Sequence, residues 1–100
     1  MAQASAQALA PTVVLPATLT LKQANAFVLE QAKVIAAVAK TQVAVDASAL
    51  KQFDSSALAV LLELRRQALA AGKSFSVSGQ SKRLRDLAGL YGVAQLLGAN

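Results

Sequence analysis

The sequence predicts a small α/β domain in which strands and helices alternate along the chain. Three short segments, 12–15, 41–45 and 73–78, are rich in β-branched residues or alternate apolar and polar side chains. Each is followed by a longer segment with apolar residues at helical spacing. This order implies parallel strand pairs joined by right-handed crossovers, with helices packed over the sheet. At 100 residues the chain has the size of one domain, spanning 1–100.

The N-terminal part contains one weakly patterned segment, one strand and one helix. Residues 1–11 are expected to form either a weakly structured arm or an edge strand. The β-branched segment 12–15 predicts a short strand, which Pro16 ends or confines to a sheet edge. Thr20 is the candidate N-cap of a helix over 21–40. The apolar positions of this helix recur at helical spacing: Ala24, Phe27, Val28, Val34, Ile35 and Val38.

The central part contains a strand and a polar connection. Segment 41–45 predicts a buried central strand, because it is short and β-branched. Asp46 closes this strand. Residues 47–53 form the connection, in which Leu50 and Phe53 are expected to turn inward.

The next helix is predicted from Asp54 or Ser55 to about Ala71. Either side chain can cap it, because a side-chain oxygen accepts an otherwise unpaired N–H of the first turn. Gly72 is typical of a residue that follows a helix C-terminus. The expected buried side consists of leucines: Leu58, Leu61, Leu62 and Leu69. The expected outer side is polar: Glu63, Arg66 and Gln67.

The C-terminal part contains a half-buried strand and a third helix. In 73–78, Phe and Val alternate with Ser, which indicates one buried face. Gly79 is expected to turn the chain, and Ser81 is the candidate cap of the helix that follows. The inward stripe of that helix is expected to be Leu84, Leu87 and Ala88. Residues 93–97 are expected to form a last short helix or an extended tail.

The composition argues against catalysis by this chain. It contains no Cys and no His, so it lacks a thiolate nucleophile, the commonest general base and the commonest metal ligand. Asp46 and Asp54 could act as paired carboxylates, but capping roles fit their positions better. No P-loop pattern is present, so any ATP chemistry would belong to a partner. We therefore expect no catalytic residues, no metal and no cofactor.

The net charge of +5 is compatible with an acidic partner, such as lipid headgroups or nucleic acid, and also with ordinary solubility. The basic residues form two small groups, at 65–66 and 82–85, without interleaved aromatic residues. This pattern argues against a platform for single-stranded nucleic acid, and no nucleic-acid partner is expected. No apolar run is long enough to span a membrane. The N-terminus lacks a basic n-region and contains Pro11 and Pro16, so a cytoplasmic protein without a signal peptide is expected.

The residues from Val45 to Leu58 resemble a known signature. Val45-Asp46, a loop, and then Phe53-Asp54-Ser55-Ser56-Ala57-Leu58 look like the STAS domain pattern. In that pattern a strand ending in Asp leads through a hydrophobic-Asp-Ser/Thr-x-Gly-Leu turn into a helix. The resemblance covers roughly residues 12–98. It implies a STAS-type α/β fold, with a mixed, mainly parallel sheet of about four strands and helices chiefly on one side.

The C-terminal segment 84–97 makes the resemblance more specific. Its Leu-Ala-Gly-Leu-Tyr at 87–91 looks like the tail of the small STAS subunit of Mla-type phospholipid ABC transporters. This resemblance implies a non-enzymatic subunit that binds and regulates or stabilises the transporter ATPase, which maintains outer-membrane lipid asymmetry. Such a subunit would lie at the inner face of the inner membrane and reach the membrane only through its complex. The alternative is an anti-sigma-factor antagonist, switched by serine phosphorylation, with a serine kinase or an anti-sigma factor as partner.

The resemblance also implies a site. The functional hydroxyl of the family falls on Ser55, which is phosphorylated in the antagonists and contacts the ATPase in the transporter subunits. The expected partner-binding residues, with Ser55 as the candidate phosphosite, are Asp54, Ser55, Ser56, Glu63, Arg66 and Tyr91. Each also has a plain structural interpretation: Ser55 as a helix cap, Glu63 and Arg66 as a solvated face, and Tyr91 as packing at the core edge. The family commonly has Gly one or two positions after the hydroxyl, and Ser56-Ala57 here favour a helix that starts promptly.

Overall fold

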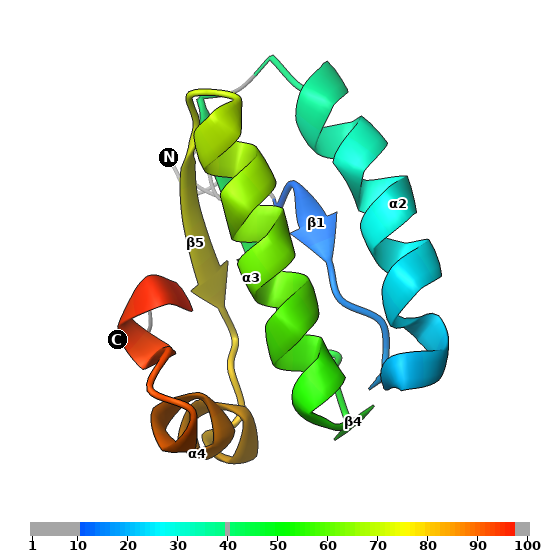
Figure 1. The fold of residues 1–100 in the computed structure, drawn as a ribbon, viewed down its shortest axis with the longest axis vertical. Coiled ribbons are helices and arrows are strands. Elements are labelled where there is room, and N and C mark those ends of the chain that lie inside the picture. The colour runs from blue at the N-terminus through cyan, green and yellow to red at the C-terminus, as the bar shows by residue number, and fades with distance from the viewer. Residues whose placement is uncertain (1–10, 40, 98–100) are drawn as a thin grey trace, which may run out of the picture.

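The computed structural model describes residues 11–39 and 41–97 (Figure 1). The expectation of an arm or edge strand over residues 1–11 therefore lies almost entirely outside the described residues. In chain order the elements are β1 (Val13–Val14), β2 (Thr18–Leu19), α2 (Leu21–Ala37), β3 (Gln42–Asp46), β4 (Gln52–Phe53), α3 (Ser55–Ala70), β5 (Ser74–Ser78), α4 (Lys82–Leu90) and the 3-10 helix η1 (Ala94–Leu97).

The main sheet has the order β1-β3-β5, and both strand pairs are parallel. Val45 of β3 lies beside Val13 on one side and Val77 on the other. The predicted α/β class, the parallel pairing and the central position of the strand at 41–45 are thus confirmed. The described strands number five rather than about four, because β2 and β4 form a second, two-stranded parallel sheet.

The core lies between the main sheet and the two long helices, which run side by side across one face of the sheet (Figure 1). Strand β3 shows why the sheet buries one face: Val43 and Val45 are fully buried, whereas the intervening Ala44 is only half-buried. From the helices, Ile35 of α2 and Leu61 and Leu64 of α3 complete the core. Leu50 and Phe53 of the connection are also buried, as expected.

Capping contacts and a glycine mark the ends of the helices. At the start of α2, Gln23 Oε1 accepts hydrogen bonds from the Thr20 N–H and from the Thr20 hydroxyl, each at 2.8 Å. At the start of α4, the Ser81 hydroxyl oxygen accepts the Leu84 N–H at 3.1 Å. After α3, Gly72 has a φ of +76°, which a residue with a side chain rarely adopts. These ends agree with the predicted caps.

Two predicted core residues are exposed, and several buried residues were not singled out from the sequence. Val34 is 37% exposed and Leu69 is 48% exposed. Leu64, not singled out from the sequence, is fully buried. The buried side of α3 includes Leu64 and Ala68. Leu69 follows Ala68 and is turned by about 100° around the helix axis, which takes its side chain out of the buried side. In addition, α2 ends at Ala37 rather than at residue 40.

None of the helices within residues 11–39 and 41–97 combines the length and the apolar character that crossing a bilayer requires. Among the same residues, no cluster of three or more carboxylates is placed to hold a metal ion.

Candidate functional site

Asp54 organises the turn that leads into α3. One carboxylate oxygen accepts the Ser56 N–H at 2.8 Å, and this bond caps the helix. The other oxygen lies 3.4 Å from the Leu21 N–H, the first residue of α2. The hydrogen bond from the Ser56 N–H is the largest influence that lowers the pKa of Asp54, so the carboxylate remains charged at neutral pH. Of the two caps proposed for α3, Asp54 is therefore the observed one.

Ser55 is the first residue of α3, and its side chain is exposed. Its hydroxyl makes no hydrogen bond to any residue that the structure describes. Because Asp54 supplies the cap, the Ser55 hydroxyl is left facing solvent at the positive end of the helix dipole. Helix α3 starts directly at Ser55, as the Ser56-Ala57 sequence indicates, and Ala57 is fully buried. Ser56 contributes its backbone N–H to the cap.

A hollow of about 480 Å³ separates the start of α3 from α4. Its lining residues come from the turn before α3 and from one side of α4: Phe53, Asp54, Ser55, Arg83, Asp86, Leu87, Leu90 and Tyr91. A smaller hollow of about 300 Å³ continues along α3, where Ser55 and Tyr91 again form part of the wall. The two hollows share Ser55 and Tyr91 in their walls and together form one depression.

Two apolar side chains on the α4 side of this depression are strongly exposed. Leu90 is 82% exposed and Tyr91 is 58% exposed, which are high values for side chains of their size. On the α3 side the surface continues through Ala59 and Leu62. We call the surface formed by Ser55, Ala59, Leu62, Leu90 and Tyr91 the α3–α4 face.

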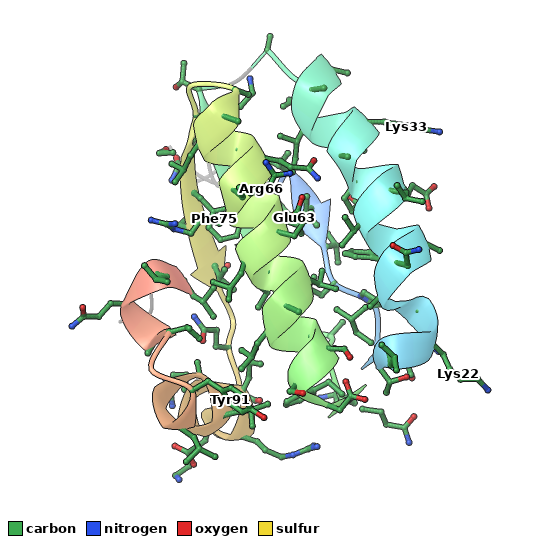
Figure 2. The ribbon with its side chains drawn as sticks, viewed as in Figure 1. Lys22, Lys33, Glu63, Arg66, Phe75 and Tyr91 are labelled. Carbon is green, nitrogen blue, oxygen red and sulfur yellow. The ribbon has the colours of Figure 1, made fainter. Side chains whose placement is uncertain are left out.

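Glu63 and Arg66 lie further along α3, where Figure 2 shows them together on its outer side. Arg66 Nε and Nη2 donate to the two Glu63 oxygens at 3.0 and 2.5 Å, and Gln67 Nε2 donates at 3.0 Å. Glu63 lines a separate hollow between α2 and α3, together with Leu21 and Val28. This pair is satisfied within its own helix.

The structure thus brings together three of the predicted site residues: Asp54, Ser55 and Tyr91. Ser56 takes part through its backbone, and the Glu63–Arg66 pair lies outside the shared depression. Leu90 and Arg83 line the depression, although the prediction did not include them. The basic group at 82–85 drew attention to Arg83, but no local sequence pattern indicates which way its side chain turns.

Asp46, the other candidate for a carboxylate pair, is occupied in its own turn. Its Oδ1 accepts the Ser48 N–H at 2.9 Å, and hydrogen bonds from Ser48 lower its pKa. Each of the two aspartates therefore stabilises a turn by binding backbone N–H groups.

The ion pair on α3 gives a pH prediction. Hydrogen bonds from Arg66 lower the pKa of Glu63 from 4.5 to about 2. Because the pKa is depressed in the folded state, any stabilisation is present above the unfolded value and is lost as the pH falls towards about 2. Arg66 is 66% exposed and Glu63 is 35% exposed, so solvent screens the pair and the gain in stability is small.

We expect an NMR titration of the Glu63 carboxyl carbon to show a midpoint near 2 in the parent protein. Arg66→Gln should raise this midpoint towards the ordinary range, because it removes both hydrogen bonds of the guanidinium. Arg65→Gln is the matched control, since it removes the same charge one residue away. An unchanged midpoint in Arg66→Gln would contradict the geometry.

The fold and the site together define a class of protein: a small α/β domain with a parallel sheet and an exposed hydroxyl at the start of the helix that crosses it. A family model described as "Mlab, STAS domain" matches residues 2–98. The chain belongs to the STAS domain family. A comparison with curated proteins gave no match.

Proposed function

We propose that this protein is the STAS subunit of an Mla-type phospholipid ABC transporter and that it binds the transporter ATPase through the α3–α4 face. The observation that carries the proposal is the exposure of Leu90 and Tyr91 beside Ser55. Adjacent exposed apolar side chains of this size mark contact surfaces, and tyrosine is enriched in protein interfaces.

The chemistry of the depression fits docking better than catalysis. Its lining combines apolar side chains, such as Leu87 and Leu90, with the charged Asp54, Arg83 and Asp86, a mixture that is common in protein interfaces. A serine nucleophile needs a general base within hydrogen-bond reach, and Asp54 already uses its oxygens to cap α3 and to bind the start of α2. On this proposal the protein is not an enzyme, and ATP hydrolysis belongs to the partner.

The proposal also assigns a place and a role. The subunit would lie at the cytoplasmic face of the inner membrane and reach the bilayer only through the ATPase and the permease. By stabilising or regulating the ATPase, it would help to maintain the lipid asymmetry of the outer membrane. The description of the matching family model supports this choice over other STAS roles.

The test is a binding titration with the purified ATPase encoded beside a phospholipid permease in the same genome. The parent chain should bind this ATPase, and Tyr91→Ala should weaken binding at least about tenfold, the loss expected when an interface tyrosine is truncated. Leu29→Ala is the matched control, because Leu29 is a comparably exposed apolar residue, 61% accessible, on α2. Failure of the parent chain to bind, or equal losses in both variants, would overturn the proposal.

The position of Ser55 favours a second candidate, an antagonist switched by phosphorylation. The hydroxyl is exposed at the first turn of α3, where a phosphate of about −1.5 to −2 charges would meet free N–H groups and the helix dipole. Asp54 and Asp86 line the same depression and would repel it. Stoichiometric phosphorylation by a purified serine kinase, together with loss of binding to an anti-sigma factor, would favour this second candidate.

Ser55→Asp should weaken partner binding while leaving the melting temperature within a few degrees of the parent. The new carboxylate lies at a helix N-terminus, where the fold tolerates negative charge, but it adds that charge to the α3–α4 face. Ser55→Asn is the control of similar size without the charge. Calorimetric titration and thermal unfolding measure the two effects, and equal affinity for Ser55→Asp and the parent would be evidence against docking at this serine.

A further inference from the structure

Arg83 bridges the two sides of the depression. Its Nη1 donates to the Lys51 carbonyl oxygen at 3.3 Å, and its Nη2 donates to the Phe53 carbonyl oxygen at 3.2 Å. The same guanidinium lies over the Phe53 ring, with Cζ 4.3 Å from the ring centroid. Phe53 itself is buried, so the ring is a fixed platform.

These contacts join the segments that carry the two halves of the α3–α4 face. Phe53 is followed by Asp54, which caps α3, and by Ser55, where the α3 half of the face begins. Arg83 lies in the first turn of α4, and the chain reaches Leu90 seven residues later, about two helical turns away on the same side. Arg83 and Leu90 accordingly line the same hollow.

The neighbouring cations of α4 are engaged elsewhere. Lys82 pairs with Asp86 within the helix at 2.7 Å. Arg85 lines a different hollow, with Ser78 and Gln80. The buried Leu84 and Ala88 pack the inner side of α4 against the core, and the bonds of Arg83 add directional contacts to this packing.

We propose that Arg83 is a positioning residue of the docking surface: by tying α4 to the backbone at Lys51 and Phe53, it sets where Leu90 and Tyr91 stand relative to Ser55. This proposal rests on the docking function of the α3–α4 face. This positioning role requires a planar guanidinium, because two of its nitrogens bind the carbonyls of Lys51 and Phe53 while its flat face covers the Phe53 ring. Lysine offers one ammonium and fulfils only part of this geometry.

The first experiment uses the free protein. Tyr91 is the one tyrosine of the chain, and the chain has no tryptophan, so its ring signals are unambiguous. We expect NMR contacts in the parent between the Tyr91 ring and Leu62 of α3, because both side chains line the same hollow. In Arg83→Gln these contacts should fall by at least half, and in Arg83→Lys they should fall less. Arg85→Gln, which removes the same charge from the same helix, should preserve them.

The second experiment measures affinity for the purified ATPase. Arg83→Gln should weaken binding about tenfold or more, Arg83→Lys should be intermediate, and Arg85→Gln should bind as the parent does. If Arg83→Gln unfolds, Arg83→Lys is compared with Arg85→Gln instead. Arg83→Lys keeps a positive charge at position 83 but lacks the guanidinium, whereas Arg85→Gln keeps Arg83 itself, so a difference in affinity between them measures the positioning effect.

The outcomes separate the two proposals. Unchanged Tyr91 contacts in both Arg83 variants would overturn the positioning role, whatever the affinity for the ATPase. Altered contacts together with a parent chain that does not bind the ATPase would uphold the positioning role and overturn the proposed partner. Altered contacts with a graded loss of affinity would support both.

Discussion

Leu64→Ala should lower the free energy of unfolding by about 3–5 kcal/mol, the range for truncating a leucine in a tightly packed core. Leu64 is fully buried on the inner side of α3. Its loss would leave a cavity between the helix and the sheet. A domain of this size has a total stability on the order of 5–15 kcal/mol, so one substitution removes a large part of it. Urea unfolding followed by circular dichroism measures the change.

The matched control for this prediction is Leu69→Ala. It deletes the same atoms from the same helix, but Leu69 is 48% exposed. We expect a loss below about 1 kcal/mol there, because little apolar surface leaves the core and no closed cavity forms. Similar losses in the two variants would show that the rotation of α3 about its axis is wrong.

Gly79→Ala should destabilise the fold by about 2–4 kcal/mol, because it combines backbone strain with a steric clash. Gly79 has a φ of +71°, in the left-handed region. An added Cβ would lie 2.9 Å from Ser48 Cβ, 3.0 Å from Ser48 N and 3.1 Å from Asp46 Oδ1. The turns after β3 and β5 would have to move apart. Thermal unfolding of the variant measures the loss.

Two other glycines separate the strain from the clash. Gly72 has a φ of +76°, and an added Cβ there meets nothing within 4 Å, so Gly72→Ala should cost only the strain of about 1–2 kcal/mol. Gly89 lies within α4 with equally open surroundings, and Gly89→Ala should stabilise the protein by about 0.5–1 kcal/mol. A smaller loss for Gly79→Ala than for Gly72→Ala would contradict the close approach of the two turns.

The sequence predicted the features that depend on neighbouring residues. Alternation in 73–78 and the β-branched run at 41–45 identified two strands, and Thr20, Ser81 and Gly72 marked helix ends. Each of these signals comes from the local chemistry of a strand face or a helix terminus, which a short segment contains in full.

Features that depend on contacts between distant parts of the chain could not be predicted from the local sequence. Gln52–Phe53 becomes strand β4 only because Thr18–Leu19 lies beside it, more than 30 residues earlier in the chain. Leu69 satisfies the helical pattern of apolar residues, but it is not among the residues of α3 that are buried in the core. Tertiary contact decides such cases.

The candidate site shows the same division. Asp54 and Ser55 were recognised together, but the choice of cap depended on which oxygen reaches the Ser56 N–H. The contribution of Arg83 could not be predicted, because its partners are backbone carbonyls about 30 residues away, and any residue type supplies a carbonyl.

The parallel arrangement of the main sheet has a consequence for how the chain folds. Val13 pairs with Val45 and Val45 pairs with Val77, so each strand contact of this sheet closes a loop of roughly 30 residues. No hairpin among its strands can form early from local sequence alone. We therefore expect α2 and α3 to provide the first ordered segments, and folding to be slower than that of a helical bundle of equal length, because non-local pairings bear the cost of loop closure before they gain stability.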